Sequence, residues 1–511
     1  MAKVAMCQDV MVEYMGFMSI SAVLKQAGHT VEVFFDDQLD EDRFIAELQA
    51  FRPHAVLFSI LSPSLSWSLR LGRRVREECG AITVFGNVHV IACPGLIDDE
   101  AVDIVCTGEG EFPMLALCKA IDEGTSYASI DGLWVKTPAG VIKNRACDDL
   151  VDVDALPFHD RAMYNKYGFF SHSTYLRVMA GRGCPFRCSF CMNPVLMDHF
   201  GGKRYLRKRS PEGAIREIEE TIRSQPGKIK FLFFIDEVFW VKNDWLHEFL
   251  DLYKKRISLP FSANFRFGGI TEDDIKLLAE AGASNMILAT ETGDEEQRRG
   301  IMNKPVTNEQ IFRIADWMHK YGISFASSCF FGLPGDTVAD HVARLEFYRR
   351  VNPTYLWTTF FQPYPGIDLA KHEGIAPFIP EQKEFALTLH TDMYLDLPDR
   401  ARLVNLKKVY FLCMKFPWLT KPLVALTKLK CDWFFTFVFG IHFAYYVFRF
   451  ERVSLYQLFV HVRNFAINPF LRQKQTLSHT GRPYTPSAKQ TTTALRTVSP
   501  PSEVQSQHMH N

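Results

Sequence analysis

Short apolar runs alternate with helix-like stretches over the first part of the chain, from residue 2 to about 125. The stretches between them repeat apolar positions at helical spacing, as residues 16–26 and 69–78 do. The apolar runs begin at Val4, Thr30, Ala55 and Ala81. This alternation predicts a parallel, doubly wound sheet covered by helices, and therefore the α/β class. Ligands on such sheets bind beyond the carboxyl ends of the strands.

The same rhythm restarts near Tyr175 and runs through six strand-helix repeats. Strands are expected at residues 175–179, 229–235, 261–266, 285–290, 324–331 and 355–360. Ser210 is a predicted N-cap, and Pro211 takes the first position of the helix that follows. Six repeats predict a partial (β/α)6 barrel of the TIM type, open on one side, with its chemistry at the carboxyl ends of the strands.

The segments between and after these two units differ from them in composition. Residues 126 to about 170 combine proline with acidic residues and lack an apolar period, which is typical of a linker. From Lys474 onward Ser, Thr, Pro and Gln dominate, which is typical of a disordered tail. We therefore divide the chain into an N-terminal Rossmann-like domain 1–130, a linker 131–169, the barrel 170–385, a helical, apolar region 386–473 and a tail 474–511.

The C-terminal part of the chain is basic, although the whole chain has a net charge of zero. From Ala401 to the end there are 15 Lys or Arg residues against three acidic ones. The longest uncharged run there, 433–448, has 16 residues, whereas a membrane-spanning helix needs roughly 20. Three interpretations stay open for residues 405–465: a segment lying in the membrane interface, a helical cap over an apolar substrate, and a soluble helical subdomain packed on the barrel.

Cysteine use and the N-terminus both point to the cytoplasm. The chain has 12 cysteines without the spacing of a disulfide framework, which favours a reducing compartment. The first residues run directly into a strand-like pattern and offer no signal peptide. We expect a cytoplasmic protein, attached peripherally to the inner face of the membrane if residues 405–465 reach a bilayer.

Three cysteines lie close together at the entry to the barrel. Cys184, Cys188 and Cys191 have the spacing C-x-x-x-C-x-x-C and follow Gly181 and Gly183. Thiolates so crowded are more readily metal ligands than disulfide partners. Three of them suit a four-iron cluster with one iron left open, because a fourth thiolate would leave no position for a substrate. Zinc closed by His199 is the alternative, and three unrelated core cysteines are another.

At these residues the chain resembles the radical S-adenosylmethionine (SAM) enzymes, whose motif has this spacing and an aromatic residue before the third cysteine. Phe190 stands at that position. The resemblance implies one 4Fe-4S cluster on the three cysteines, with SAM bound through its amino and carboxylate groups to the open iron. One electron, from a donor of the flavodoxin or ferredoxin type, then cleaves SAM to a 5′-deoxyadenosyl radical.

The ends of the predicted barrel strands carry further elements that are similar to those of this family. The resemblance implies that a carboxylate of Asp236-Glu237 holds the ammonium of SAM, that Glu291 contacts its polar groups and that the turn at Gly332 lies against its adenine. Exposed loop acids remain the alternative for Asp236-Glu237, and Arg266 can either meet a carboxylate or cap acidic neighbours. With Phe190, the candidate SAM-binding residues are Asp236, Glu237, Arg266, Glu291, Gly332 and Pro334.

Three stretches of the N-terminal domain look like the cobalamin-binding domain that precedes the barrel in one subgroup of this family. Ser59-Ile60-Leu61 matches an S-x-L element, Gly86-Asn87 stands where a double glycine is usual, and Gly108 to Glu111 matches a G-E-G-E element. The D-x-H-x-x-G signature is absent, so cobalamin is expected without a histidine on cobalt, and His29 is interpreted as structural. The candidate cobalamin contacts are Ser59, Leu61, Gly86, Asn87, Gly108, Glu109 and Gly110. A Rossmann-like domain without a cofactor is the alternative.

Together these resemblances imply an enzyme, a cobalamin-dependent radical SAM methyltransferase acting on an unactivated carbon and consuming two SAM molecules per turnover. The apolar C-terminal region favours a small apolar substrate, such as a lipid, hopanoid, polyprenoid or tetrapyrrole, and no nucleic acid.

Three other functions stay open. One is an oxidative cyclase of the same family that transfers no methyl group. Another is a transfer RNA methylthiotransferase, although no second set of cluster cysteines is evident around Cys7, Cys79 and Cys93. The third is a cobalamin-binding scaffold with an inactive barrel, against which the intact cysteine triplet argues.

Overall fold

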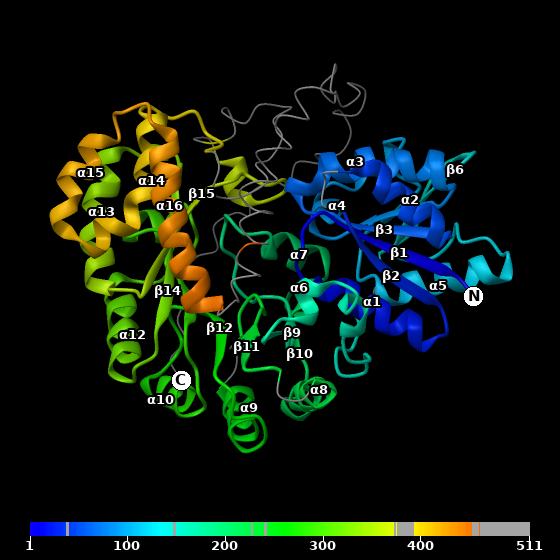
Figure 1. The fold of residues 1–511 in the computed structure, drawn as a ribbon, viewed down its shortest axis with the longest axis horizontal. Helices are drawn as coiled ribbons and strands as arrows, with labels where there is room; N and C mark the ends of the chain where they lie inside the picture. Colours follow the sequence, from blue (N-terminus) through cyan, green and yellow to red (C-terminus); the bar gives the residue numbers. More distant parts are fainter. Residues whose placement is uncertain are drawn as a thin grey trace, which may run out of the picture.

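The computed structural model describes residues 1–36, 40–146, 150–225, 228–239, 243–372, 375, 393–451 and 459. Within them the chain forms two α/β lobes, with a set of C-terminal helices on the side of the second lobe away from the first (Figure 1). The tail expected over 474–511 lies outside the described residues, as do most residues at the expected boundary near 385.

The first lobe is built on a seven-stranded sheet in the order β2-β1-β3-β4-β5-β6-β7. β1 to β5 are parallel, and β6 and β7 add an antiparallel edge. The strands are β1 Lys3–Gln8, β2 Thr30–Phe35, β3 Ala55–Ser59, β4 Ile82–Gly86, β5 Ile104–Cys106, β6 Leu133–Thr137 and β7 Gly140–Lys143. The helices are α1 Met15–Gln26, α2 Glu41–Phe51, α3 Leu65–Arg74, α4 Val88–Ala92 and α5 Glu111–Glu123. One core lies on each face of the sheet, one with α1 and α5 and the other with α2 and α3.

The second lobe is a six-stranded parallel sheet in the order β15-β14-β13-β12-β11-β8. Its strands are β8 Tyr175–Val178, β11 Phe231–Phe234, β12 Phe261–Arg266, β13 Met286–Ala289, β14 Phe325–Phe331 and β15 Tyr355–Phe360. Its helices include α8 Pro211–Ser224, α9 Asn243–Arg256, α10 Glu272–Glu280, α11 Glu295–Arg299, α12 Asn308–Lys320 and α13 Val338–Val351. β8 and β15 form the two edges and do not pair with each other in the described part of the chain, so the barrel is partial.

The predicted α/β fold class is confirmed, and so is the predicted N-cap of α8. The Ser210 hydroxyl accepts a hydrogen bond from the amide of Gly213 at 3.1 Å, and Pro211 begins α8. A side chain at this position satisfies one of the free amides of the first helical turn. Part of the predicted linker 131–169 instead forms β6, which pairs with β5 and thereby extends the first sheet beyond residue 130.

The C-terminal helices are α14 Arg400–Lys415, α15 Thr420–Leu426 and α16 Asp432–Tyr446. Leu406, Val409 and Tyr410 of α14 are fully buried in the same core as the barrel strands, so α14 is an integral part of that lobe. α16 joins this core through Phe435 and Tyr446. The stretch Asp432–Phe450 is long and apolar enough to cross a membrane by length and composition alone, and 28% of it is buried.

Candidate active site

The cysteine loop is carried by a two-stranded hairpin that follows the first barrel strand. β9 (Gly181–Arg182) pairs antiparallel with β10 (Arg207–Lys208), and α7 (Asn193–His199) begins directly after the loop. A Cβ on Gly181 would lie 2.6 Å from the Arg207 carbonyl oxygen. Gly183 has φ +91°, and a Cβ there would lie 2.8 Å from the Tyr205 carbonyl oxygen. Both glycines are therefore required by the packing of the chain on itself, without reference to a ligand.

The loop is fastened to the far side of the barrel through its own backbone. The Ser189 amide donates to the Met302 carbonyl at 3.1 Å, and the Leu369 amide donates to the Ser189 carbonyl at 2.8 Å. The Asn303 side chain donates to the Arg187 carbonyl at 2.7 Å. Phe190 packs edge-on against Phe330, with ring centroids 5.3 Å apart. These contacts fix the loop at the carboxyl ends of the strands.

All three cysteine sulfurs receive hydrogen bonds, and the donor to Cys184 is the Phe186 amide. Arg266 Nη1 lies 3.3 Å from Cys188 Sγ, and the same guanidinium stacks over the Phe186 ring with its carbon 3.8 Å from the centroid. The backbone and side-chain nitrogens of Asn193 both lie 3.5 Å from Cys191 Sγ. Donors aimed at sulfur stabilise a thiolate, and they tune a cluster that the thiolate holds.

The electrostatics of the loop oppose ionisation of the free thiols. Burial, followed by the nearby charges of Cys191, Cys188 and Glu237, raises the pKa of Cys184 to about 11, although the hydrogen bond from the Phe186 amide lowers it. Burial also raises the pKa of Cys191. Thiols in such a place ionise when a cation compensates their charge, and binding of a metal then releases protons. The cysteines are thus suited to a positively charged iron core.

The arrangement does not suit a single zinc ion. No three His, Cys, Asp or Glu side chains among the described residues gather closely enough to hold one metal ion. His199, the candidate fourth ligand, instead has its Nε2 2.5 Å from the Thr107 carbonyl oxygen of the other lobe. The thiolates of a four-iron cluster bind different irons, so they lie farther apart than the ligands of one metal ion. The three cysteines share one loop and are close enough to affect the pKa of Cys184, which fits a cluster.

Asp236 and Glu237 follow β11 and have different surroundings. Asp236 is 1% exposed, accepts a hydrogen bond from the Ala180 amide at 2.9 Å and pairs with Lys208 of β10. Glu237 is exposed, lies near Cys184 and accepts a hydrogen bond from the Gly183 amide. Desolvation by the surrounding protein, followed by the charge of Asp236, raises the pKa of Glu237. Of these two adjacent residues, Glu237 has the carboxylate that a ligand beside the cysteines can reach.

Glu291 follows β13 in a left-handed backbone conformation, with φ 68°. Its carboxylate accepts a hydrogen bond from the Ser328 hydroxyl at 2.7 Å and pairs with buried Lys304 at 3.2 Å. It lies near enough to Cys191 to raise the pKa of that thiol. A residue other than glycine in this conformation is strained, and such strain is held in place by its surroundings, often at functional sites.

The Gly332 to Pro334 turn after β14 is built on a buried charge cluster. Asp336 accepts a hydrogen bond from the Leu333 amide at 3.0 Å and is held by Arg344 at 2.8 Å and by His341. Gly332 has φ +82°, and a Cβ there would lie 2.6 Å from Met393 Cγ. The close approach that requires glycine is thus made by Met393. Pro334 is half-buried beside it.

At the carboxyl edge of the first sheet, the strand ends of β3 and β4 meet. The Asn87 side chain donates to the Ser59 hydroxyl at 2.9 Å and accepts from the Val88 amide at 2.7 Å. Gly86 lies opposite Ser59 in the register, and Leu61 beside them is 40% exposed. An open edge with polar groups and one exposed apolar side chain fits a large, flat ligand such as cobalamin. His29 is elsewhere, 3.4 Å from Asp122.

Glu109, a candidate cobalamin contact, has its carboxylate bound by arginines of the second lobe. Its carboxylate accepts hydrogen bonds from Arg182, Arg207 and the Val151 amide. Burial alone would raise the pKa of Glu109, but the two arginines outweigh it and hold the pKa at about 2. Gly110 makes room for Ile20, whose Cδ1 would lie 2.8 Å from a Cβ there, and Gly108 lies beside Phe200.

The structure therefore gathers Glu237, Arg266 and Glu291 around the three cysteines, and Ser59, Leu61, Gly86 and Asn87 at the edge of the other sheet. Asp236 lies beneath the first group, in a buried ion pair. The charged partners Arg182, Arg207, Lys208 and Lys304 were missed from the sequence, because no motif marks a residue whose role depends on a partner far along the chain.

Comparison with known protein families matches both lobes. A model of the B12 binding domain matches residues 7–118, and one of the radical SAM superfamily matches residues 178–348. The chain is a cobalamin-binding radical SAM protein. These domains carry the 4Fe-4S cluster, SAM and cobalamin as cofactors, as the resemblance implied.

Relatives of this cobalamin-binding radical SAM protein include methyltransferases and cyclases. It is 25% identical over 405 residues to the anaerobic magnesium-protoporphyrin IX monomethyl ester cyclase of Rubrivivax gelatinosus, covering 76% of this chain and 70% of the relative. It is 23% identical over 442 residues to the cytidylyl-2-hydroxyethylphosphonate methyltransferase of Streptomyces wedmorensis, covering 73% and 80%. The fold matches that of the radical SAM methyltransferase TsrM from Kitasatospora setae with cobalamin and a 4Fe-4S cluster bound, with a TM-score of 0.60, 18% identity, and 72% and 74% of the two chains covered.

Proposed function

We propose that this protein methylates an unactivated carbon of an apolar small molecule. The observation that carries the proposal is the adjacency of the two cofactor edges. α7 starts directly after Cys191 and Met192, and it packs against α4, which starts directly after Asn87. The cysteine loop and the carboxyl edge of the first sheet are thereby held next to each other, as a transfer between their ligands requires.

When bound, the cluster and SAM supply the radical that removes a hydrogen atom, and cobalamin supplies the methyl group. The residues of the chain hold and shield these groups. Arg266 and Asn193 donate hydrogen bonds to the sulfurs of Cys188 and Cys191. Glu237 and Glu291 offer carboxylates for the ammonium of SAM, and a cation there favours their ionised form. The electron comes from an external donor of the flavodoxin or ferredoxin type.

An apolar substrate is supported by the C-terminal helices and by one relative. Tyr410 of α14 lies in the core against Phe331 at the end of β14, so the helices border the strand ends where substrate binds. The relative from Rubrivivax gelatinosus is named for a tetrapyrrole, magnesium-protoporphyrin IX monomethyl ester. We therefore place tetrapyrroles first, before lipids, hopanoids and polyprenoids. The name of the same relative favours a second candidate function, oxidative ring formation without methyl transfer.

The test uses the full chain, reconstituted anaerobically with iron, sulfide and cobalamin. The holoenzyme is incubated with a strong reductant, a tetrapyrrole ester and SAM that carries a trideuterated methyl group. Methylation predicts 5′-deoxyadenosine together with a product that has gained the labelled group. Ring formation predicts 5′-deoxyadenosine and an unlabelled product. No 5′-deoxyadenosine would overturn both functions, and about eight irons per chain instead of four would favour a methylthiotransferase with two clusters.

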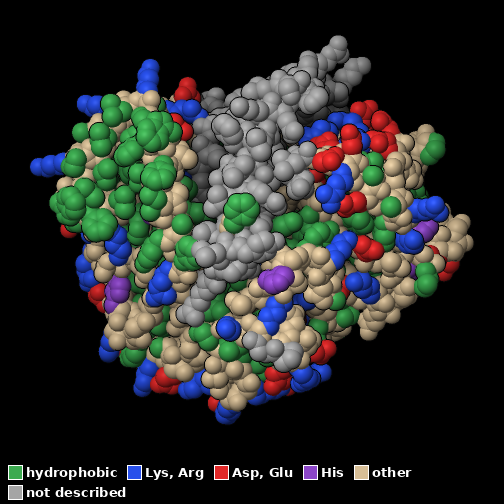
Figure 2. All heavy atoms as spheres, in the orientation of Figure 1, with side chains coloured by type: hydrophobic (Ala, Val, Ile, Leu, Met, Phe, Trp, Pro, Cys, Tyr) green, Lys and Arg blue, Asp and Glu red, His purple; other side chains and the backbone are tan. Residues whose placement is uncertain are grey.

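We further propose that the C-terminal helices rest on an anionic membrane. Trp433, Phe437 and Ile441 of α16 are 73%, 63% and 58% exposed and lie four residues apart, on one face of the helix. Tyr445 and Phe448 continue this stripe, which we call the aromatic face. Figure 2 shows hydrophobic side chains gathered over this part of the molecule, with basic side chains at the margin. Lys421, Lys428 and Lys430 nearby are exposed, which suits an anionic bilayer.

The double variant Phe437→Asp/Ile441→Asp is expected to weaken binding to phosphatidylglycerol vesicles at least about tenfold, because two exposed apolar anchors are lost. Vesicle co-sedimentation measures this, with phosphatidylcholine vesicles as a charge control. The matched control is Phe112→Asp, which removes an exposed aromatic ring, 55% accessible, from the first lobe. Equal sedimentation of the double variant and the control would refute the membrane contact.

A further inference from the structure

Four charged side chains join the Gly108–Glu111 turn of the first lobe to the hairpin that carries the cysteine loop. Arg182 of β9 binds Glu109 at 2.7 Å and Glu111 at 2.5 Å. Arg207 of β10 binds both carboxylate oxygens of Glu109, at 2.7 and 2.8 Å. We call Glu109, Glu111, Arg182 and Arg207 the ion-pair joint.

The joint is buried and its charges balance. Its four side chains are between 2% and 16% exposed, and two guanidinium groups face two carboxylates. Planar, bidentate contacts of this kind fix orientation as well as distance. Removing one partner of such a group leaves an uncompensated buried charge, which is strongly unfavourable.

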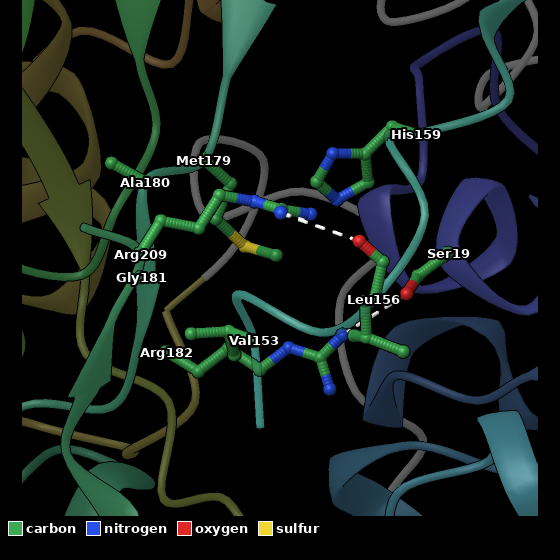
Figure 3. A pocket seen from close by; sticks show the side chains of 9 residues that line it. All are labelled: Ser19, Val153, Leu156, His159, Met179, Ala180, Gly181, Arg182 and Arg209. Carbon is green, nitrogen blue, oxygen red and sulfur yellow. Dashed lines mark hydrogen bonds between the residues drawn. The ribbon is translucent and has the colours of Figure 1, made fainter. Parts of the chain in front are cut away.

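The linker and α1 complete the joint. Arg207 also donates a hydrogen bond to the Val151 carbonyl at 2.5 Å, and Arg182 donates to the Ser19 hydroxyl of α1 at 3.2 Å. Figure 3 shows Arg182 extending from β9 toward Ser19 across a small hollow, and Arg209 reaching the Leu156 carbonyl from the same side. The first lobe, the linker and the barrel entry therefore meet at one point.

The same turn also holds the other flank of the cysteine loop. Arg182 precedes Cys184 by two residues and is bound to Glu109 and Glu111. His199, at the end of the helix that follows Cys191, contacts the Thr107 carbonyl. The segment from Thr107 to Glu111 thus contacts the chain both before and after the three cysteines. It lies at the same edge of the first sheet as Ser59 and Asn87.

We propose that the ion-pair joint sets the distance and orientation between the cluster and the corrinoid, with Glu109 and Arg207 as positioning residues. Each lobe has its own sheet and its own core, so neither needs the joint in order to fold. Glu109 then acts through the arginines and not by contact with cobalamin. This role is independent of which substrate the enzyme methylates.

The test compares the reconstituted holoenzyme with Glu109→Gln and Arg207→Gln. The reduced cluster and cob(II)alamin each carry an unpaired electron, and their magnetic interaction depends on the separation between them. Both variants are expected to keep iron and cobalamin but to lose the defined splitting in the electron paramagnetic resonance spectrum. Proteolysis within residues 125–170 should become at least about tenfold faster, because the ion-pair joint no longer holds the linker through Val151.

Two further variants make the result decisive. Arg207→Lys keeps the charge but not the planar, bidentate contact, so it should retain more of the splitting than Arg207→Gln and less than the parent protein. Arg256→Gln removes a surface pair with Glu212 and Glu219, and should change nothing. The proposal is overturned if Glu109→Gln keeps the splitting and the proteolysis rate of the parent protein. It is also overturned if this variant loses cobalamin while the linker stays protected, since Glu109 would then be a corrinoid contact.

Discussion

Cys188→Ala is expected to abolish both the iron-sulfur absorbance of the reconstituted protein and its release of 5′-deoxyadenosine from SAM. The site has three thiols on one loop, and Cys188 is the buried one that receives the Arg266 hydrogen bond. Removing a partner of a metal ligand already costs about 10- to 100-fold in affinity or activity, so removing the ligand itself should cost at least about 100-fold. Visible spectra and chromatography of the quenched reaction measure the two losses.

The control for this variant is Cys79→Ala, which removes a half-buried thiol of the first lobe. It should keep the cluster and the cleavage of SAM. The Cys188 variant should also retain the far-ultraviolet circular dichroism of the parent, since the loop is fastened by backbone hydrogen bonds of Ser189. Continued SAM cleavage by Cys188→Ala would mean that the cluster ligands are misassigned.

Asp236→Asn is expected to lower the stability of the protein and Glu237→Gln to weaken its binding of SAM, although the two residues are adjacent. Asp236→Asn leaves the ammonium of Lys208 buried without its partner, which should cost about 3 kcal/mol and lower the midpoint of thermal unfolding by roughly 6–12 °C. Glu237→Gln removes an exposed carboxylate that lies near Cys184. It should leave the midpoint unchanged and weaken SAM binding by about 10- to 100-fold, as loss of a charged hydrogen bond does.

Calorimetry and SAM titration of both variants provide the comparison, and each variant serves as the control for the other. A stable Asp236→Asn protein with weak SAM binding would show that Asp236 is the ligand. A destabilised Glu237→Gln protein would show that its carboxylate holds the fold.

Local pattern was enough to predict the two sheets, since each strand and cap depends on residues next to it. Ser210 caps α8 because its hydroxyl reaches an amide three residues on. The roles of Asp236 and Glu109 could not be predicted in this way. They depend on Lys208 and Arg207, which the β9–β10 hairpin brings to them from 28 residues before Asp236 and 98 residues after Glu109.

The reason for a glycine could not be predicted from the sequence either. Gly183 and Gly332 stand where glycine suggests contact with a ligand, yet the atoms that would clash with a Cβ belong to Tyr205 and Met393. A glycine in the sequence indicates that another atom approaches the backbone closely, but it does not indicate whether that atom belongs to a ligand or to the protein. In contrast, the cysteine spacing predicted its chemistry well, because all three side chains come from one short loop.

The unpaired edges of the second sheet bear on how wide the opening of the barrel can become. Since β8 and β15 share no ladder in the described chain, spreading them apart breaks no hydrogen bond between strands. A closed eight-stranded barrel resists such widening, because every strand is bonded on both sides. The width of this one can therefore change with the twist between neighbouring strands, within the limit that the cross-barrel hydrogen bonds of Ser189 set.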